Sequence, residues 1–67
     1  MKKFTIDCLV GDEVYFNWVN KYVEGTIKEI NQDWFILDIK PEFVDNVSIG
    51  SEMGIAIQIV KDEISIQ

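Results

Sequence analysis

Apolar and polar residues alternate along most of this chain, a pattern that predicts short β-strands. Successive side chains of a strand point to opposite faces, so every second residue faces the core. Four apolar rows of this kind are present: Phe4, Ile6, Cys8 and Val10; Val14, Phe16 and Trp18; Phe35, Leu37 and Ile39; and Met53, Ile55, Ile57 and Ile59. Ile64 and Ile66 continue the alternation at the end of the chain.

Short polar or glycine-containing stretches separate these rows and predict turns. They are Gly11-Asp12, Asn20-Lys21, residues 31–33, Gly50-Ser51 and Lys61-Asp62. Pro41 ends the preceding strand, and residues 41–47 are predicted to form one helical turn. Proline suits the first position of a helix, and acidic residues near its start interact well with the helix dipole.

The stretch 19–30, "VNKYVEGTIKEI", predicts a hairpin turn followed by a bent strand. A glycine inside a strand pattern often marks a bulge or a sharp bend. We therefore expect the strand to bend at Gly25. Because a bulge changes the face to which later side chains point, Ile27 and Ile30 would then both face the core although they are three residues apart.

Composition supports an all-β domain. The chain has eleven isoleucines and seven valines against two leucines and one alanine, and β-branched residues favour strands. At 67 residues it forms one domain, residues 1–67, without a linker or repeat. Five or six short strands with one helical turn predict a small closed or partly open barrel.

Few catalytic groups are present. The chain has no histidine, which excludes the usual serine or cysteine catalytic triads and histidine-containing zinc sites. Cys8 lies in an apolar row, which predicts a core residue. The adjacent carboxylates Asp12-Glu13 and Asp62-Glu63 would point to opposite faces. We therefore expect no enzyme activity, no cofactor and no metal.

The net charge of −6, with six lysines and no arginine, disfavours direct nucleic-acid binding. A single cysteine is typical of a reducing compartment. No apolar stretch approaches the ~20 residues of a membrane span, and the N-terminus lacks a signal-peptide pattern. These features predict a cytoplasmic location. Frequent isoleucine, lysine and asparagine are typical of AT-rich bacterial, phage or mobile-element genomes.

The segments "VYFNWVN", "GTIKEI", "NQD" and "WFILDI", followed later by "VKDEIS", resemble Sm-like proteins of the Hfq type. "GDEVYF" before "EGTIKEINQDWFILDI" is also similar to Tudor-type and KOW-type SH3-like barrels, and "VSIGSEMGIAIQI" to TOBE-type barrels. The resemblance implies a five- or six-stranded SH3-like/Sm-like barrel and ring assembly. By position, Trp34 and Lys61 would lie near the family's base-stacking aromatic residue and its lysine.

The chain departs from the Sm-like pattern in several places. Residues 4–10 are predicted as a strand where the family has a helix, and one residue fewer separates Asn20 from Gly25. Asp62 stands where the family has histidine, and the basic character is missing. RNA-binding activity is therefore not expected to carry over.

The outward face of the predicted strands is unusually apolar. It holds Leu9, Tyr15, Val19, Trp34, Ile36 and Val60. Such a surface indicates either an interface or apolar side chains packed at the barrel corners and under residues 41–49. Tyrosine and tryptophan are enriched at interfaces, and Trp34 at a strand start would serve as an anchor or as a lid over the barrel end.

These observations predict a non-enzymatic protein–protein interaction module, acting as a homo-oligomer and competing for a basic partner surface. The alternative is a nucleotide-like small ligand bound between subunits. Trp34 or Tyr15 would then stack on a ring, and Lys61 or Lys28 would meet a phosphate.

Overall fold

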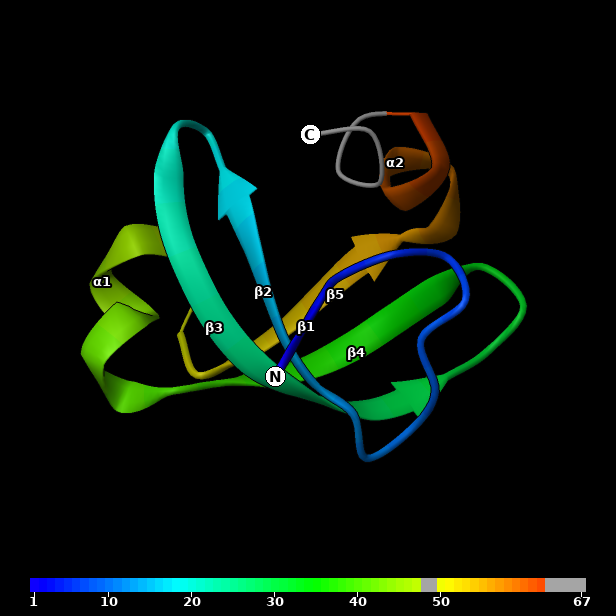
Figure 1. Cartoon of the computed structure of the whole chain (residues 1–67), viewed down its shortest axis with the longest axis horizontal. Coiled ribbons are helices and arrows are strands. Elements are labelled where there is room, and N and C mark those ends of the chain that lie inside the picture. The colour runs from blue at the N-terminus through cyan, green and yellow to red at the C-terminus, as the bar shows by residue number, and fades with distance from the viewer. Residues whose placement is uncertain (48–49, 63–67) are drawn as a thin grey trace.

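A computed structural model describes residues 1–47 and 50–62 (Figure 1). They form a single five-stranded sheet with the strand order β1-β2-β3-β4-β5. The elements are, in chain order, β1 (Lys2–Lys3), β2 (Glu13–Trp18), β3 (Lys21–Ile30), β4 (Trp34–Ile39), the 3-10 helix η1 (Pro41–Phe43), α1 (Val44–Val47), β5 (Glu52–Ala56) and α2 (Ile57–Asp62). The prediction of a β-rich chain is thereby confirmed.

Strand β3 joins the two halves of the sheet. It pairs antiparallel with β2 and with β4, and Figure 1 shows it as a long, strongly curved ribbon with α1 beside it. Gly25 lies opposite Val14 on one side and Ile39 on the other. A Cβ atom on Gly25 would lie 2.7 Å from the backbone oxygen of Asp38, so the close approach of β4 requires glycine here.

The bulge expected with the bend at Gly25 lies three residues later. The register between β3 and β4 is regular through Ile27 and shifts between Ile27 and Glu29, which makes Lys28 the extra residue of a bulge. The expected consequence is confirmed: Ile27 is buried, and Ile30 is partly buried and packs against the core. The predicted position of the bulge was wrong because glycine is needed at residue 25 for the close approach of β4 rather than for the bulge.

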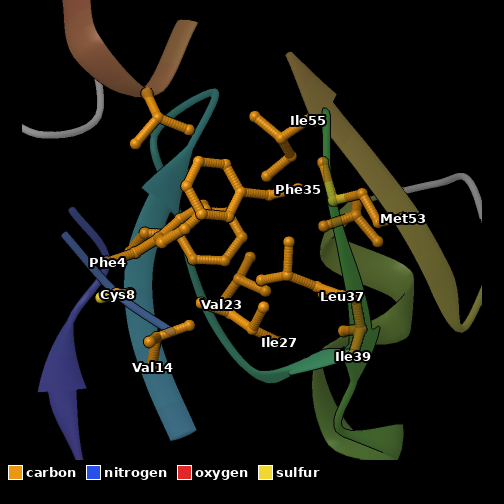
Figure 2. Close-up of a cluster of buried hydrophobic side chains, with 13 residues drawn as sticks. Phe4, Cys8, Val14, Val23, Ile27, Phe35, Leu37, Ile39, Met53 and Ile55 are labelled. Atoms are coloured by element: carbon orange, nitrogen blue, oxygen red, sulfur yellow. The ribbon is translucent and has the colours of Figure 1, made fainter. Parts of the chain in front are cut away.

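The core lies between the β2 side of the curved sheet and the β4–β5 side. Figure 2 shows Phe4 and Cys8 approaching it from one side and Leu37 and Met53 from the other. The Phe4 ring packs against Phe16 of β2, with ring centroids 5.3 Å apart. The inward rows of β2 and β4 are thereby confirmed, with Trp18 partly buried at the end of β2.

The N-terminal prediction was wrong. Only Lys2–Lys3 form a strand, and residues 4–10 are a loop. Phe4 and Cys8 are buried, whereas Ile6 and Val10 are exposed. The Phe4 N–H still donates to the Tyr15 carbonyl of β2 at 2.9 Å, and beyond it the loop has local contacts: the Cys8 N–H donates to the Thr5 carbonyl at 3.2 Å. Alternation within this stretch therefore reflected two anchoring side chains, not a strand.

The hairpin between β2 and β3 turns at Val19-Asn20, one residue earlier than predicted. Both residues have positive φ, 50° for Val19 and 65° for Asn20. This is the pattern of a type I′ turn, which matches the twist of the flanking strands. The predicted turn over residues 31–33 is confirmed: the Asn31 side-chain oxygen accepts hydrogen bonds from the N–H groups of Asp33 and Trp34.

The helical turn predicted over residues 41–47 is confirmed, with Pro41 at its start and Glu42 in the first turn. The row predicted to run from Met53 to Ile59 is correct only as far as Ile55. Strand β5 ends at Ala56, and Ile57 and Ile59 belong to α2.

Two further predictions in this region were wrong. Lys61-Asp62 is the end of α2 and not a turn, and Val60, expected to face outward, is fully buried. A helix starting at Ile57 places Val60 on the same face as Ile57, which packs against the core, because residues three apart in a helix are neighbours. Ile64 and Ile66 lie outside the described residues.

Candidate functional site

An exposed apolar surface lies on the outer face of β4 and β5. We define the Trp34 surface as Trp34, Ile36 and Gly54 with the four charged residues beside them, Lys28, Glu29, Asp38 and Glu52. Trp34 is 46% exposed and Ile36 is partly buried. Both point away from the core because Phe35 and Leu37, their neighbours in β4, point into it.

Gly54 leaves the centre of this surface open. It lies opposite Ile36 in the β4–β5 ladder, whose register is regular throughout. A Cβ atom on Gly54 would lie 3.4 Å from Cδ1 of Ile36 and 3.7 Å from Cε3 of Trp34. Both distances allow a side chain, so neither crowding nor a positive φ requires glycine here. The two apolar side chains border Gly54 and remain accessible.

Carboxylates surround the single lysine of the Trp34 surface. Lys28, the bulge residue of β3, donates a hydrogen bond to Glu52 of β5 at 2.6 Å. This bond, together with the charges of Glu52, Asp38 and Glu29, raises the pKa of the Lys28 ammonium above its usual value of 10.5. Three carboxylates against one ammonium give the surface a net negative charge.

The turn before β4 fixes Trp34 at the edge of this surface. Asn31 accepts from the Trp34 N–H at 2.9 Å, and the Asn31 N–H donates to the Trp34 carbonyl at 3.0 Å. Asp33 is exposed and places a further carboxylate next to Trp34 in the chain. Its backbone carbonyl accepts from the N–H of Ile57 at 2.9 Å, which ties the turn to the start of α2. These hydrogen bonds fix the backbone position of Trp34 at the edge of the surface.

A second aromatic group lies on the outer face of β2 and β3. The rings of Tyr15 and Tyr22 are stacked with centroids 6.1 Å apart, and Phe43 of η1 meets Tyr22 edge-on at 5.5 Å. Asn46 of α1 donates to the Tyr22 carbonyl at 2.8 Å. Because Tyr22 contacts both η1 and α1, this group serves mainly to attach the helical segment to the sheet.

Ion pairs reinforce that attachment. Lys40, which follows β4, lies 2.9 Å from Glu24 and 3.1 Å from Glu13. Hydrogen bonds from Tyr22 and Lys40 lower the pKa of the Glu24 carboxyl below its usual value. Hydrogen bonds to Glu24 and Glu13 raise the pKa of the Lys40 ammonium. The hydrogen bond to Glu24 raises the pKa of the Tyr22 hydroxyl. Unlike those of the Trp34 surface, the charged side chains around the second aromatic group, Glu13, Glu24 and Lys40, are all paired with one another.

The remaining predicted residues are scattered. Val19 occupies the hairpin tip and is 79% exposed, and Leu9 lies in the N-terminal loop. Lys61 is exposed at the end of α2. Trp34, Ile36 and Lys28 are therefore brought together on one surface, whereas Tyr15 belongs to the second aromatic group.

Four members of the Trp34 surface were missed from the sequence, Gly54, Glu29, Asp38 and Glu52, and so was Tyr22 of the second aromatic group. Gly54 interrupts the strand pattern "MGIA", and a glycine inside a strand is a recognised sign of close approach by a backbone or ligand. Tyr22 was missed because its neighbours depend on the pairing register and on the docking of η1, which local sequence does not reveal.

No three histidine, cysteine, aspartate or glutamate side chains in residues 1–47 and 50–62 come together as a metal site. None of the helices formed by these residues has the length and apolar character that a membrane crossing requires. No family model matches the chain, and comparisons with curated proteins and with solved structures find no significant match. The candidate site accordingly rests on its own geometry and charge.

Proposed function

We propose that this chain is a non-catalytic protein-binding module whose Trp34 surface holds a basic segment of a partner protein. The observation that carries the proposal is that exposed Trp34 shares the outer face of β4 with Asp38, four residues further along the strand, and that Asp38 lies opposite Glu52, the partner of Lys28. An aromatic anchor beside charged rim residues is the usual composition of an energetically important contact.

The chemistry of this surface favours a cationic partner. One lysine or arginine of a bound segment would contact the indole face of Trp34, which attracts cations, and a second would meet the carboxylates of Asp38 and Glu52 at the other end of the surface. Among the described residues, neither Asp38 nor Glu29 forms an ion pair. The cation near them, Lys28, is already hydrogen-bonded to Glu52. A basic segment would therefore neutralise charge that the fold leaves uncompensated.

The alternative, a nucleotide-like ligand, is less well supported. Its phosphate would need a free cation next to the stacking aromatic residue. Lys28, the cation of the Trp34 surface, is 2.6 Å from Glu52 and is surrounded by carboxylates. A phosphate there would meet net repulsion.

The wider proposal retains an SH3-like or Sm-like barrel as the fold, a cytoplasmic location and assembly as a homo-oligomer. Two features support assembly. Exposed apolar side chains occur on several surfaces, and a domain of 67 residues buries too little apolar area for high stability alone. Association would raise the melting temperature as the protein concentration increases.

A peptide array tests the partner proposal. We expect lysine- and arginine-containing peptides to bind and their glutamate-containing analogues not to bind, with weaker binding at high salt. Trp34→Ala should reduce affinity on the order of 30-fold, the scale of an interface hot spot. Leu9→Ala, which removes another exposed apolar side chain, is the matched control and should bind normally.

Charge reversal provides a second variant if Trp34→Ala unfolds. Asp38 and Asp45 are both exposed, but only Asp38 lies on the Trp34 surface. Asp38→Lys should abolish binding of basic peptides, and Asp45→Lys should leave it nearly unchanged. Equal loss in both variants, or no basic peptide bound by the native chain, contradicts the proposal.

A further inference from the structure

The two outer strands of the sheet differ greatly in length. Strand β1 has two residues and pairs with β2. Strand β5 has five residues and, among the described residues, pairs only with β4 (Figure 1). A long edge strand presents a row of unpaired backbone groups that accept another strand.

The hydrogen-bonding pattern identifies which backbone groups of β5 are free. The Ile39 N–H donates to the Ser51 carbonyl, and the Ile57 N–H donates to the Asp33 carbonyl. Bonded pairs alternate along an antiparallel ladder, so between these two points Met53 and Ile55 bond to β4. The N–H and C=O groups of Glu52, Gly54 and Ala56 therefore point toward the open edge.

This edge lacks the usual protection against pairing. Natural edge strands carry a free charge, a proline or a bulge that prevents another strand from adding. Strand β5 contains no proline, its register with β4 is regular, and its one charged residue, Glu52, is bound to Lys28. Gly54, at the middle of the strand, presents no side chain to an approaching backbone.

We infer that β5 pairs antiparallel with β5 of a second copy of this chain, with the twofold axis at Gly54. The inference rests on the proposed homo-oligomer and names its contact. Gly54 would lie opposite the partner's Gly54, and Glu52 opposite the partner's Ala56. This register brings no like charges face to face. A basic partner strand would gain little here, because Lys28 already neutralises Glu52, and β1 is too short to serve as the complementary edge.

Amide hydrogen exchange tests the pairing on the native protein. In the monomer, the amides of Met53 and Ile55 should be protected and those of Gly54 and Ala56 should exchange quickly. In the dimer all four should be protected, so protection of Gly54 should increase with protein concentration. Protection of Gly54 that is equally strong in the dilute monomer would mean that the same chain occupies the edge, and would overturn the inference.

Cysteine cross-linking tests the register. Gly54→Cys should form a disulfide-linked dimer, because opposite residues of a bonded antiparallel pair lie ~5.5 Å apart at Cα, within disulfide range. Ala56→Cys alone should not cross-link, since the two cysteines would be separated by four residues along the strands. The native chain, whose Cys8 is buried, is the control. Cross-linking by Ala56→Cys and not by Gly54→Cys contradicts the register.

The outcomes separate this inference from the wider proposal. Gly54→Pro removes an N–H that β4 does not use, and proline is tolerated at such edge positions. The inference predicts that Gly54→Pro is a folded monomer at concentrations where the native chain is a dimer. A native chain that is monomeric at all concentrations defeats both the assembly and the inference. A native oligomer that Gly54→Pro leaves intact defeats only the inference.

Discussion

Phe4 meets Phe35 edge-on, with the two ring centroids 5.1 Å apart and an interplanar angle of 89°. This contact joins the N-terminal loop to β4, on the opposite side of the core from β2. The loop therefore belongs to the core through Phe4 and Cys8, although the N-terminal segment adds only the two residues of β1 to the sheet.

Phe4→Ala should destabilise the fold strongly. Truncating a buried phenylalanine costs about 3–5 kcal/mol, comparable to the whole stability expected of so small a domain. Ile6→Ala, two residues away and 37% exposed, should cost far less than truncation of the fully buried Phe4. Urea unfolding of both variants measures the difference. Similar losses would mean that residues 4–10 form the strand that alternation alone predicts.

Two glycine substitutions should have opposite effects. Gly25→Ala places a Cβ atom 2.7 Å from the Asp38 backbone oxygen, which forces the strands apart and should cost about 1–3 kcal/mol or more. Gly54→Ala has room and an ordinary backbone conformation, so stability should be unchanged or rise by up to about 1 kcal/mol. Thermal melts at one protein concentration compare the two. Equal destabilisation would contradict the described β3–β4 and β4–β5 packing.

Val19→Asn should stabilise the hairpin. A β-branched residue at φ of 50° is strained, whereas asparagine adopts this conformation readily and is favoured in type I′ turns. We expect a gain of about 1 kcal/mol, because strain of this kind costs about 1–3 kcal/mol. The melting temperature measured against the native chain checks this. A loss of stability would show that the exposed valine side chain has a packing role in the assembled protein.

Glu24→Gln should reveal a pH-dependent contribution. The pKa of the Glu24 carboxyl is lowered in the fold by Tyr22 and Lys40, so its contribution is present above its ordinary pKa of 4.5. That contribution is lost as the pH falls through the lowered folded-state pKa. The variant should therefore melt below the native chain at pH 7, and the difference should shrink progressively as the pH falls below 4.5. A difference that persists at acid pH would assign the effect to packing.

The sequence predicted the inward rows of β2 and β4 because each alternates between clear turn signals. It failed after Ile55, where the apolar run "IAIQIV" suits a strand row as well as a helix with Ile57 and Val60 on one face. The bulge itself was expected, but its position at Lys28 was missed, since a polar residue in a strand gives no local sign of extra length.

The candidate site was likewise predicted only in part: the outward residues of β4 were identified, and their neighbours on other strands were not. Period-two alternation correctly placed Trp34 and Ile36 on the outer face. Their adjacency to Gly54 and to the Lys28–Glu52 pair depends on which strands pair and in what register. That information lies in contacts between residues distant in the sequence, so one chain read alone does not supply it.

Chemical-shift mapping tests the central claim most directly. The ¹⁵N-labelled chain would be titrated with an eight-residue peptide of alternating arginine and valine, and with its glutamate analogue as a control. The account predicts that the arginine peptide shifts the Trp34 indole N–H and the amides of Lys28, Ile36 and Asp38, and that the glutamate peptide shifts none of them. Shifts centred on Tyr15, Tyr22 and Phe43, or equal shifts with both peptides, would contradict a basic-segment site at the Trp34 surface.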